Sequence, residues 1–539
     1  MTKLNNNSEQ RNWKMIVFLS LVICQLSVSP VWAQIKLNFN ENSPLRKLQI
    51  AEMAVSHLYV DSVDEAKLVE DGIKGMLKEL DPHSSYTDAK ETKAMNEPLA
   101  GDFEGIGVQF NMVEDTLLVV QTITGGPSEK VGIIAGDRII AVNDTAIAGV
   151  KMSRTDIMKR LRGKKGTKVT VKVVRRGVEK PLEFVIKRDK IPVHSINAAY
   201  MIRPQAGYIR IESFGSKTYD EFMAAVDSLR QHGMKHLIID LQENGGGYLE
   251  TAVRIINEFL DDGDMIVYTS GRAVPRREYR AHGNGSLKDI GITVLIDEFS
   301  ASASEIVAGA IQDHDRGLLV GRRSFGKGLV QRPIELPDGS MIRLTVAHYY
   351  IPSGRCIQKP YKKGDLKEYQ MDIEYRLKKG ELTNPDSIHF ADSLKCFTLK
   401  QHRAVYGGGG VMPDIFVPLD TMKYTKCHRQ LVAKSIIINQ TLKYIDNNRK
   451  QLHKTYKTFN DFERGFTVPQ SLLDNIFAEG EKQNIKPKED NERTRTCDYL
   501  SVQLKSLIAR DLWGMCEYFK IWNEHSDIVK KALQVMTDN

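Results

Sequence analysis

The chain of 539 residues has little cysteine, and its distribution excludes two kinds of site. Zinc motifs use cysteines and histidines at characteristic spacings such as Cys-x-x-Cys, and no spacing in this chain suggests zinc. Cys24 lies in the N-terminal segment, and the other five cysteines are an odd number at wide spacings: Cys356, Cys396, Cys427, Cys497 and Cys516. A zinc motif and a disulfide framework are therefore not indicated, although an oxidising compartment would permit a single bridge.

Long hydrophobic runs are missing after the N-terminal segment, so no later stretch is predicted to span a bilayer. The apolar stretch over residues 15–28 follows Arg11 and Lys14 and is short for a membrane span. Ala33 ends a cleavage motif, so residues 1–33 are predicted to be a secretory signal peptide. The alternative is an uncleaved N-terminal anchor. The protein is expected to be exported, and to be periplasmic or associated with the cell envelope.

No charge of one sign dominates the composition. Lysine and arginine number 76 against 68 acidic residues, which gives a formal net charge of +8. This mild excess does not indicate nucleic acid as a partner. The most basic local run, residues 159–165, either binds phosphates or is a solvated helix end and loop. Charged residues make up 27% and hydrophobic residues 41%, a balance typical of a folded soluble protein.

Helical periodicity and strand signals divide the rest of the chain into regions. Alternating strands and helices predict an α/β core within a multidomain α+β chain, a layered β-sheet covered by helices. Residues 360–400 are rich in lysine and weakly patterned, which predicts a linker or surface excursion. The other predicted regions are a helical region over 43–98, short strands over 101–191, the core over 192–360 with 400–418, and a helical region over 420–539.

Several elements can be placed within these regions. In the C-terminal region, apolar residues from Leu431 to Ile445 share helical spacing and predict one helix. A helix is expected over residues 302–311, directly after a buried strand over 293–297. Other strands are expected over residues 116–122, 168–174, 207–211, 237–241, 318–320 and 341–350.

A cluster of serines stands at the start of the helix that follows strand 293–297: Ser300, Ser302 and Ser304. A hydroxyl there meets the positive end of the helix dipole, beside N–H groups that can stabilise an oxyanion. Ser302 is followed three residues later by Glu305, which is the pattern of a capping box. Taken alone, these residues favour a helix cap over a nucleophile.

Lys327 follows Gly326 in a predicted turn. A lysine with an enclosed stem can lose its charge by desolvation, and only the neutral amine can take a proton from a serine. The alternative is a solvated loop lysine. Gly321-x-x-x-x-Gly326-Lys327 also matches most of a P-loop, but Gly328 stands where a P-loop has Ser or Thr for magnesium. Nucleotide binding is therefore not expected.

A glycine-rich turn over Asn244–Gly247 follows a buried strand at 237–241. In an acyl-transfer enzyme such a turn can present a backbone N–H as one half of an oxyanion hole. The amide of Ala303 would be the other half. A tight strand-to-helix turn is the plain alternative, and both can hold together.

The order of short strands and one helix over 101–191, with the stretch Gly132–Asn143, resembles a PDZ domain of the circularly permuted type found in bacterial proteases. That resemblance implies a loop whose backbone N–H groups bind a peptide carboxylate, while the peptide pairs as an added strand. The alternative is a glycine hairpin with no ligand. The loop residues are Gly105, Ile106, Gly107 and Val108.

Across residues 45 to 418 the chain resembles the carboxy-terminal processing peptidases, or tail-specific proteases. The resemblance implies a crotonase/ClpP-like catalytic core, an inserted PDZ domain and flanking helical regions. The matching pieces are Leu80–Tyr86, Gly105–Val108, Leu161–Gly166, Asp240–Gly247, Ser300–Glu305 and Phe325–Gly328 with Gln331.

The resemblance also implies roles for individual residues. The nucleophile falls on Ser302, the general base on Lys327, and a partner that orients the lysine on Gln331. The oxyanion amides fall on Gly246 and Ala303. No metal, nucleotide or other cofactor is implied.

Two of these assignments stay open. The family often has proline where Gly245 stands, so the choice between Gly246 and Gly247 is not settled. Arg162, at the end of the predicted PDZ helix, is a candidate for gating the site.

The function expected from this resemblance is an exported serine endopeptidase. It would recognise the C-terminal tails of protein substrates through its PDZ domain and cleave them with a Ser–Lys dyad by way of an acyl-enzyme. The alternative is a non-catalytic PDZ-bearing scaffold that binds tails. Residues 420–539 match no known function and are expected to pack on the core, contact an adaptor or mediate a homodimer.

Overall fold

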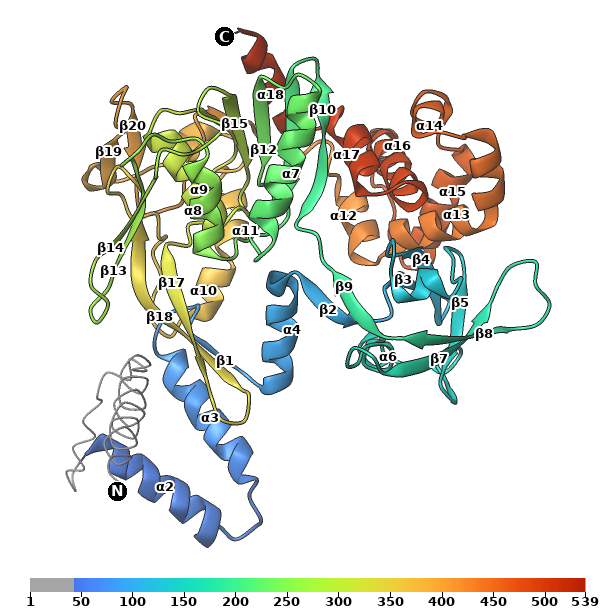
Figure 1. The fold of residues 1–539 in the computed structure, drawn as a ribbon, viewed down its shortest axis with the longest axis horizontal. Helices are drawn as coiled ribbons and strands as arrows, with labels where there is room; N and C mark the ends of the chain where they lie inside the picture. Colours follow the sequence, from blue (N-terminus) through green and yellow to red (C-terminus); the bar gives the residue numbers. More distant parts are fainter. Residues whose placement is uncertain (1–42, 539) are drawn as a thin grey trace, which may run out of the picture. The chain divides into compact units, whose positions relative to one another are not determined.

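The computed structural model describes residues 43–538, which fall into two compact units that part between Gly75 and Met76. The predicted signal peptide lies outside the described residues. The first unit holds α2 (Pro44–Leu58) and most of α3 (Glu65–Lys78) (Figure 1). The Ser43 side chain caps α2 by accepting from the amide of Arg46.

The second unit is built on a six-stranded sheet in the order β10-β11-β12-β15-β16-β21. The edge strand β10 is antiparallel to β11, and the other neighbours are parallel. The central strands are near-continuous apolar runs, as expected where helices cover both faces of a parallel sheet. Their bounds are Ile196–Arg203, Ala206–Ile211, His236–Asp240, Gly291–Ile296, Leu318–Gly321 and Ile415–Phe416.

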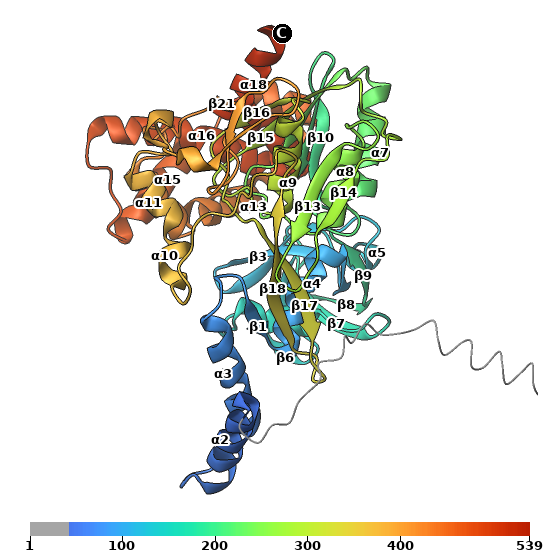
Figure 2. The same cartoon turned by 90° about the vertical axis from the view of Figure 1, so that its left-hand side faces the viewer.

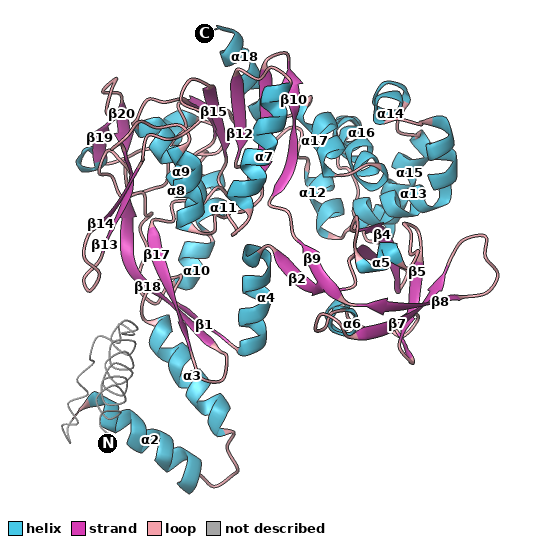
Figure 3. Cartoon of the chain, viewed as in Figure 1, coloured by secondary structure: helices cyan, strands magenta, loops and turns pink. Residues whose placement is uncertain are grey.

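Helices bury both faces of this sheet. Ile239 and Val294 face a core shared with α7, α8 and α9, whereas Ile238 and Leu295 face the opposite side. On that side they pack with Phe519 of α17 and with α18. Figure 3 shows the same layers by element type. The covering helices are α7 (Thr218–Gln231), α8 (Leu249–Asn257), α9 (Ala303–Asp313), α17 (Met515–Asn523) and α18 (Asp527–Asp538).

A second sheet carries a long hairpin that extends from the core, formed by β17 and β18 (Figures 1 and 2). Strand β18 also pairs with β1 and β13, and β14 pairs with β13. This hairpin places Gln331 of β17 within hydrogen-bond distance of Lys327. The strands are β1 (Ser85–Thr87), β13 (Met265–Ser270), β14 (Arg277–Arg280), β17 (Leu329–Glu335) and β18 (Met341–Tyr350).

The PDZ-like region is an insertion with its own apolar core. The chain enters it after α4 (Ala89–Ala100) through β2 (Asp102–Gly105) and leaves through β9 (Asp189–Pro192), which pair antiparallel. The predicted strands at 116–122, 168–174 and 341–350 coincide with β4, β7 and β18. The remaining elements are β3 (Val108–Val113), α5 (Pro127–Lys130), β5 (Arg138–Val142), β6 (Thr145–Ala146), α6 (Arg154–Leu161) and β8 (Leu182–Lys187).

The C-terminal region is helical, as expected, but one predicted helix is two. Ser435 has φ 56°, which ends α12 (Lys426–Ala433) before α13 (Ile436–Thr455) begins. Periodicity misses this break because both helices bury their apolar faces in one core. Within residues 43–538, no helix has the length and hydropathy of a membrane span. The other helices are α14 (Phe459–Gly465), α15 (Gln470–Lys482) and α16 (Asp490–Leu512).

Residues 360–400, predicted to be a linker or surface excursion, lie mostly at the surface but hold regular elements that a linker would lack. Tyr369 and Arg376 are only 6% and 3% exposed, and they lie in two short helices, α10 and α11, that pack on the core. Weak periodicity misled the prediction because these helices are too short to show it. The ordered elements are α10 (Leu366–Gln370), α11 (Asp372–Lys378), two 3₁₀ turns (Pro385–Ser387 and Asp392–Leu394), and β19 (Lys395–Phe397) paired with β20 (Ala404–Tyr406).

Candidate active site

Ser302 lies in the sharp turn that joins β15 to α9. It is the N-cap residue, with φ 57° and ψ −115°, a conformation that a residue other than glycine rarely adopts. The Ser302 amide donates to Glu305 Oε2 at 2.8 Å, so the glutamate carboxylate holds the strained turn. The capping box predicted from sequence is therefore present. The same geometry places the hydroxyl at the end of the parallel strands, in a strand-turn-helix setting suited to a nucleophile.

The three clustered serines have different environments. Ser300 and Ser304 are fully buried. The Ser300 hydroxyl donates to the carbonyl of Leu241 at 2.8 Å, and that of Ser304 donates to the carbonyl of Asn244 at 2.9 Å. Ser302 is partly exposed. Two of the hydroxyls therefore brace the turn from inside, and Ser302 is the one that solvent can reach.

The glycine turn is tied to the serine turn through Asn244. The Asn244 carbonyl accepts from the Ala301 amide at 3.0 Å. Its side-chain Oδ1 accepts from the amide of Gly246 at 2.8 Å. A Cβ on Gly246, whose φ is 99°, would meet Ser302 Cβ at 2.8 Å and Ala303 N at 2.9 Å. Glycine is therefore required here by both conformation and contact, and its amide already has an acceptor.

Lys327 lies in the loop between β16 and β17. Its Nζ donates to Gln331 Oε1 at 3.1 Å, and Gln331 Nε2 donates to the carbonyl of His83. Burial lowers the pKa of Lys327 below its ordinary value, and the nearby Arg343 lowers it further. The negative charges of Glu305 and Asp81 act in the opposite direction. The structure thus brings together the lysine and glutamine that the sequence singled out.

Two buried side chains bridge the serine and lysine turns. Glu305 Oε2 accepts from the amides of both Ser302 and Lys327, each at 2.8 Å. The Tyr349 hydroxyl lies 3.1 Å from the carbonyl oxygen of Ser302 and also contacts that of Lys327. The main chains of the two turns therefore lie close together and share both partners.

Glu305 is fully buried and accepts from four donors. Besides the two amides, these are the Ser324 hydroxyl at 2.5 Å and the Gly326 amide at 2.7 Å. Burial raises the pKa of Glu305 above its ordinary value, and the four hydrogen bonds offset part of that rise. Four donors without a competing acceptor suit an ionised carboxylate. The sequence indicated Glu305 only as half of a capping box.

Sequence reasoning missed three other neighbours of the lysine turn. Tyr349 lies on β18, where strand patterning gives no sign of a polar role. Arg376, from the segment predicted as a linker, donates to the carbonyls of Ser324 and Arg323 at 3.1 and 2.6 Å. His83 has its pKa lowered to about 4, mainly by burial and then by the Lys327 charge. Its place in the Leu80–Tyr86 motif was the only available signal.

The predicted peptide loop, Gly105–Val108, lines a cavity of about 440 Å³ together with β3 and α6. Ile106 is buried in the core of the PDZ-like region, and its carbonyl accepts from the Ser128 hydroxyl at 2.7 Å. Gly107 has φ 74°, as a glycine turn allows. The loop is therefore a rigid rim of the cavity.

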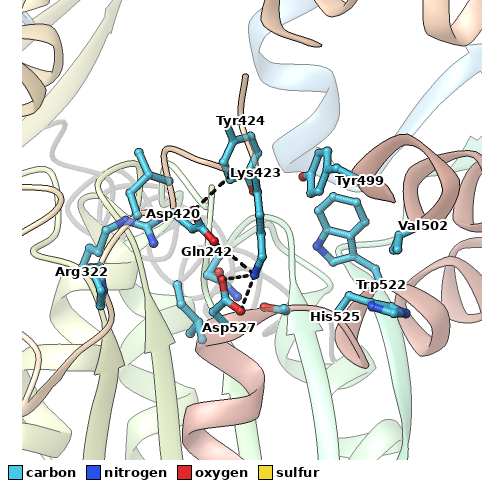
Figure 4. Close-up of a pocket in the computed structure, with 14 residues that line it drawn as sticks. Gln242, Arg322, Asp420, Lys423, Tyr424, Tyr499, Val502, Trp522, His525 and Asp527 are labelled. Carbon is cyan, nitrogen blue, oxygen red and sulfur yellow. Dashed lines mark hydrogen bonds and ion pairs between the residues drawn. The ribbon is translucent and has the colours of Figure 1, made fainter. Parts of the chain in front are cut away.

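Other cavities lie between the core and the C-terminal helices. The larger, about 740 Å³, reaches Phe299, three residues before Ser302. A small one, about 100 Å³, is drawn in Figure 4, where Lys423 lies between Asp420 and Asp527. Lys423 Nζ donates to both Asp527 oxygens at 2.7 Å, so this lysine is engaged. Over residues 43–538, no three metal-ligating side chains gather as a metal would require.

Comparison with known proteins agrees with this organisation. Residues 205–367 match peptidase family S41, 105–186 match the PDZ domain, 25–92 match the activating protease CtpB N-terminal domain, and 427–514 match a family of unknown function, DUF8443. A carboxy-terminal-processing protease of Bartonella bacilliformis is 38% identical over 355 residues, which is 64% of this chain and 80% of that protein.

Two further relatives carry similar names. The carboxy-terminal processing protease CtpA of Bacillus subtilis is 35% identical over 349 residues, which is 63% of this chain and 74% of that one. Among solved structures, the photosystem II D1 C-terminal processing protease is 26% identical. It covers 69% of this chain and 92% of its own, with a TM-score of 0.35.

Proposed function

Because the chain belongs to the carboxy-terminal-processing proteases of peptidase family S41, which are serine endopeptidases, we propose that Ser302 is the nucleophile and Lys327 the general base. One observation carries this assignment. Ser302 is the exposed serine of its cluster, and its main chain shares both of its bridging partners with Lys327.

The chemistry follows from the lowered pKa of Lys327. A neutral amine takes the proton of the Ser302 hydroxyl as the oxygen attacks the scissile carbonyl carbon. The tetrahedral intermediate collapses, the C–N bond breaks, and the ammonium of Lys327 gives its proton to the leaving amine. Water, deprotonated by the same lysine, then attacks the acyl-enzyme and releases Ser302. Gln331 holds the Lys327 amine in place through its Oε1.

The oxyanion of each tetrahedral intermediate needs N–H donors. The Ala303 amide is suitable because it begins α9, and the first amides of a helix have no acceptor within it. We assign Gly246 as the second donor, as the family resemblance implies. Its amide must then turn from Asn244 Oδ1 toward the substrate, a small rearrangement of the glycine turn on substrate binding.

Protein substrates are proposed to bind through their C-terminal tails. The tail carboxylate would meet the loop over Gly105–Val108, and the tail would pair with β3 as an added strand. The protein would act outside the cytoplasm, after export directed by residues 1–33.

The test is cleavage of fluorescein-labelled casein by the full chain. Ser302→Ala and Lys327→Ala should each abolish cleavage while leaving the thermal unfolding transition in place. Normal turnover by Ser302→Ala would overturn the assignment. A wild-type protein that binds tails but cleaves nothing would instead be the non-catalytic scaffold.

A further inference from the structure

The C-terminal helices bridge the PDZ domain and the catalytic core. Asp446 of α13 pairs with Arg138 of β5 at 2.6 Å, and its carbonyl accepts from Arg176 at 2.7 Å. On the other side, Asn523 of α17 donates to the Tyr200 hydroxyl of β10 at 2.9 Å. Figure 1 shows these orange and red helices beside β3, β4 and β5. The C-terminal helices therefore contact both the PDZ domain and the catalytic core.

Two residues of this region lie in the wall of the PDZ cavity. The cavity of about 440 Å³ is bounded on one side by the Gly105–Val108 loop, β3 and α6. On the other side it is bounded by Arg510, near the end of α16, and Met515, at the start of α17. The groove that would hold a tail is therefore not made by the PDZ domain alone.

Arg510 differs from the other arginines of the cavity. Arg162 pairs with Glu97 at 2.5 Å and lies over the ring of Phe103, and Arg154 lies over Phe110. The Arg510 side chain forms no hydrogen bond, ion pair or ring contact with any residue that the structure describes. Its neighbour Asp511 is engaged by Arg449. The N–H groups of Arg510 are therefore available to a ligand in the groove, while its charge also acts on the neighbouring Asp511.

The same residues connect the groove to the neighbourhood of Ser302. Asn197, Arg510 and Met515 line both the PDZ cavity and the cavity of about 740 Å³. That second cavity continues between the core and the C-terminal helices as far as Phe299, on the turn that carries Ser302. The two cavities are therefore adjacent, the C-terminal helices form one wall of both, and the second cavity reaches the turn that carries Ser302.

We propose that the C-terminal helices complete the tail-binding groove, and that Arg510 binds a carboxylate of the substrate tail. Guanidinium and carboxylate form charge-assisted, often bidentate hydrogen bonds, which give both affinity and orientation. The carboxylate is either that of the chain terminus or that of an acidic side chain near it. Met515 packs on the apolar part of the tail. This inference rests on the proposed binding of tails by the PDZ domain.

The test is tail binding by the full chain carrying Ser302→Ala, which prevents cleavage. The probe is a fluorescein-labelled decapeptide with three apolar residues at a free C-terminus and a glutamate just before them. Fluorescence anisotropy should give an affinity about tenfold weaker for Arg510→Ala. The matched control is Arg493→Ala, near the other end of α16, which removes the same charge away from the groove. It should change the affinity less than twofold.

Two altered peptides distinguish the source of the carboxylate. If Arg510 binds the chain terminus, amidation of the C-terminus should abolish the difference between Arg510→Ala and its control. If it binds the side chain, replacement of the glutamate by glutamine should abolish it instead. Either result supports the proposal. Equal binding of every peptide by Arg510→Ala and Arg493→Ala would overturn it.

A second measurement needs no substitution in α16. A photoreactive benzophenone on the fifth residue from the peptide's C-terminus should cross-link to the segment that contains Arg510 and Met515, as mapped by mass spectrometry. Cross-links confined to the PDZ domain would contradict a groove completed by the C-terminal helices. Failure of the Ser302→Ala protein to bind any free-carboxylate peptide would overturn tail capture itself, and with it this inference. Binding without dependence on Arg510 would leave the proposed protease intact.

Discussion

Ser302 and Lys327 are held by the same two side chains, one on the amides and one on the carbonyls. Glu305 Oε2 accepts from both amides at 2.8 Å, and the Tyr349 hydroxyl contacts both carbonyl oxygens. Both side chains are buried, so neither bridge is weakened by competing water. The turns that carry the proposed nucleophile and base are thus fixed to each other by shared contacts, which is what a Ser–Lys pair would require of its scaffold.

Replacing each serine of the cluster should separate catalysis from packing. Ser302→Ala should abolish cleavage of labelled casein and change the free energy of unfolding by less than about 0.5 kcal/mol. Ser300→Ala should lower the free energy of unfolding by about 1–3 kcal/mol, because the Leu241 carbonyl loses a buried donor. Urea denaturation and initial cleavage rates measure the two effects. A stable, inactive Ser300→Ala protein beside an active Ser302→Ala protein would reverse the assignment.

Glu305→Gln should affect both stability and the pH profile. The amide can accept fewer of the four donors, so we expect a loss of about 1–3 kcal/mol for each buried donor left unpaired. We also expect kcat to fall about a hundredfold as the two turns loosen. Because the Glu305 charge raises the pKa of Lys327, its removal should move the rising limb of the pH–rate profile to lower pH.

Glu298→Gln is the control for that change. Glu298 is also a buried glutamate, in the loop that precedes α9, but it pairs with Arg322 and not with the Lys327 turn. Its pH–rate profile should stay in place even if its stability falls. A Glu305→Gln protein that loses stability but keeps the pH limb of wild type would make Glu305 purely structural.

Tyr349→Phe removes the hydroxyl that contacts both carbonyls and keeps the ring. We expect a stability cost of about 0.5–1.5 kcal/mol, typical of one hydrogen bond, and a fall in kcat of about tenfold with KM unchanged. Tyr350→Phe, on the next residue of β18, where the ring stacks on Tyr268, should leave kcat unchanged. A rise in KM alone for Tyr349→Phe would argue against a role in positioning the dyad.

Arg343→Gln should shift the pH dependence in the direction opposite to Glu305→Gln. The Arg343 charge lowers the pKa of Lys327, so its removal raises that pKa and moves the rising limb of the pH–rate profile to higher pH. Arg332→Gln on β17 changes the net charge equally and should leave the limb in place. Single-turnover rates across the alkaline range measure the shift, and identical limbs for the two variants would exclude Lys327 as the titrating base.

Lys327 should also make the free energy of unfolding depend on pH. Its pKa is lowered in the folded protein, so between that value and its ordinary value the unfolded chain binds more protons. The free energy of unfolding should therefore rise with pH across this window. Lys327→Met should flatten that rise, which chemical denaturation at a series of pH values would detect.

Local patterns predicted much of the fold. Strands β4, β7 and β18 coincide with the expected ranges because alternating or β-branched residues favour a strand locally, within a few positions of the chain. The PDZ-like order of strands was readable for the same reason. Periodicity gave no signal for α10 and α11, because these helices are short. It also gave none for the break at Ser435, because that break depends on the backbone conformation of one residue.

The candidate site was only partly accessible from sequence. The residues themselves left Ser302 among three serines and favoured a helix cap, and the family resemblance made the choice. Burial of Ser300 and Ser304 now separates them from Ser302 by a physical criterion. The capture of the Gly246 amide by Asn244 had no signal in the sequence, because it depends on how a turn closes in three dimensions.

The sequence alone predicted the class of fold, the serine and lysine motifs and the PDZ-like module. Each of these depends on residues that are near one another in the chain. The contacts of Glu305, Tyr349 and Arg510 join residues from separate elements. Packing of the sheet against α9, the β17–β18 hairpin and the C-terminal helices brings them together. That packing decides which lysine is desolvated, which serine is exposed and which arginine of the PDZ groove has no side-chain partner.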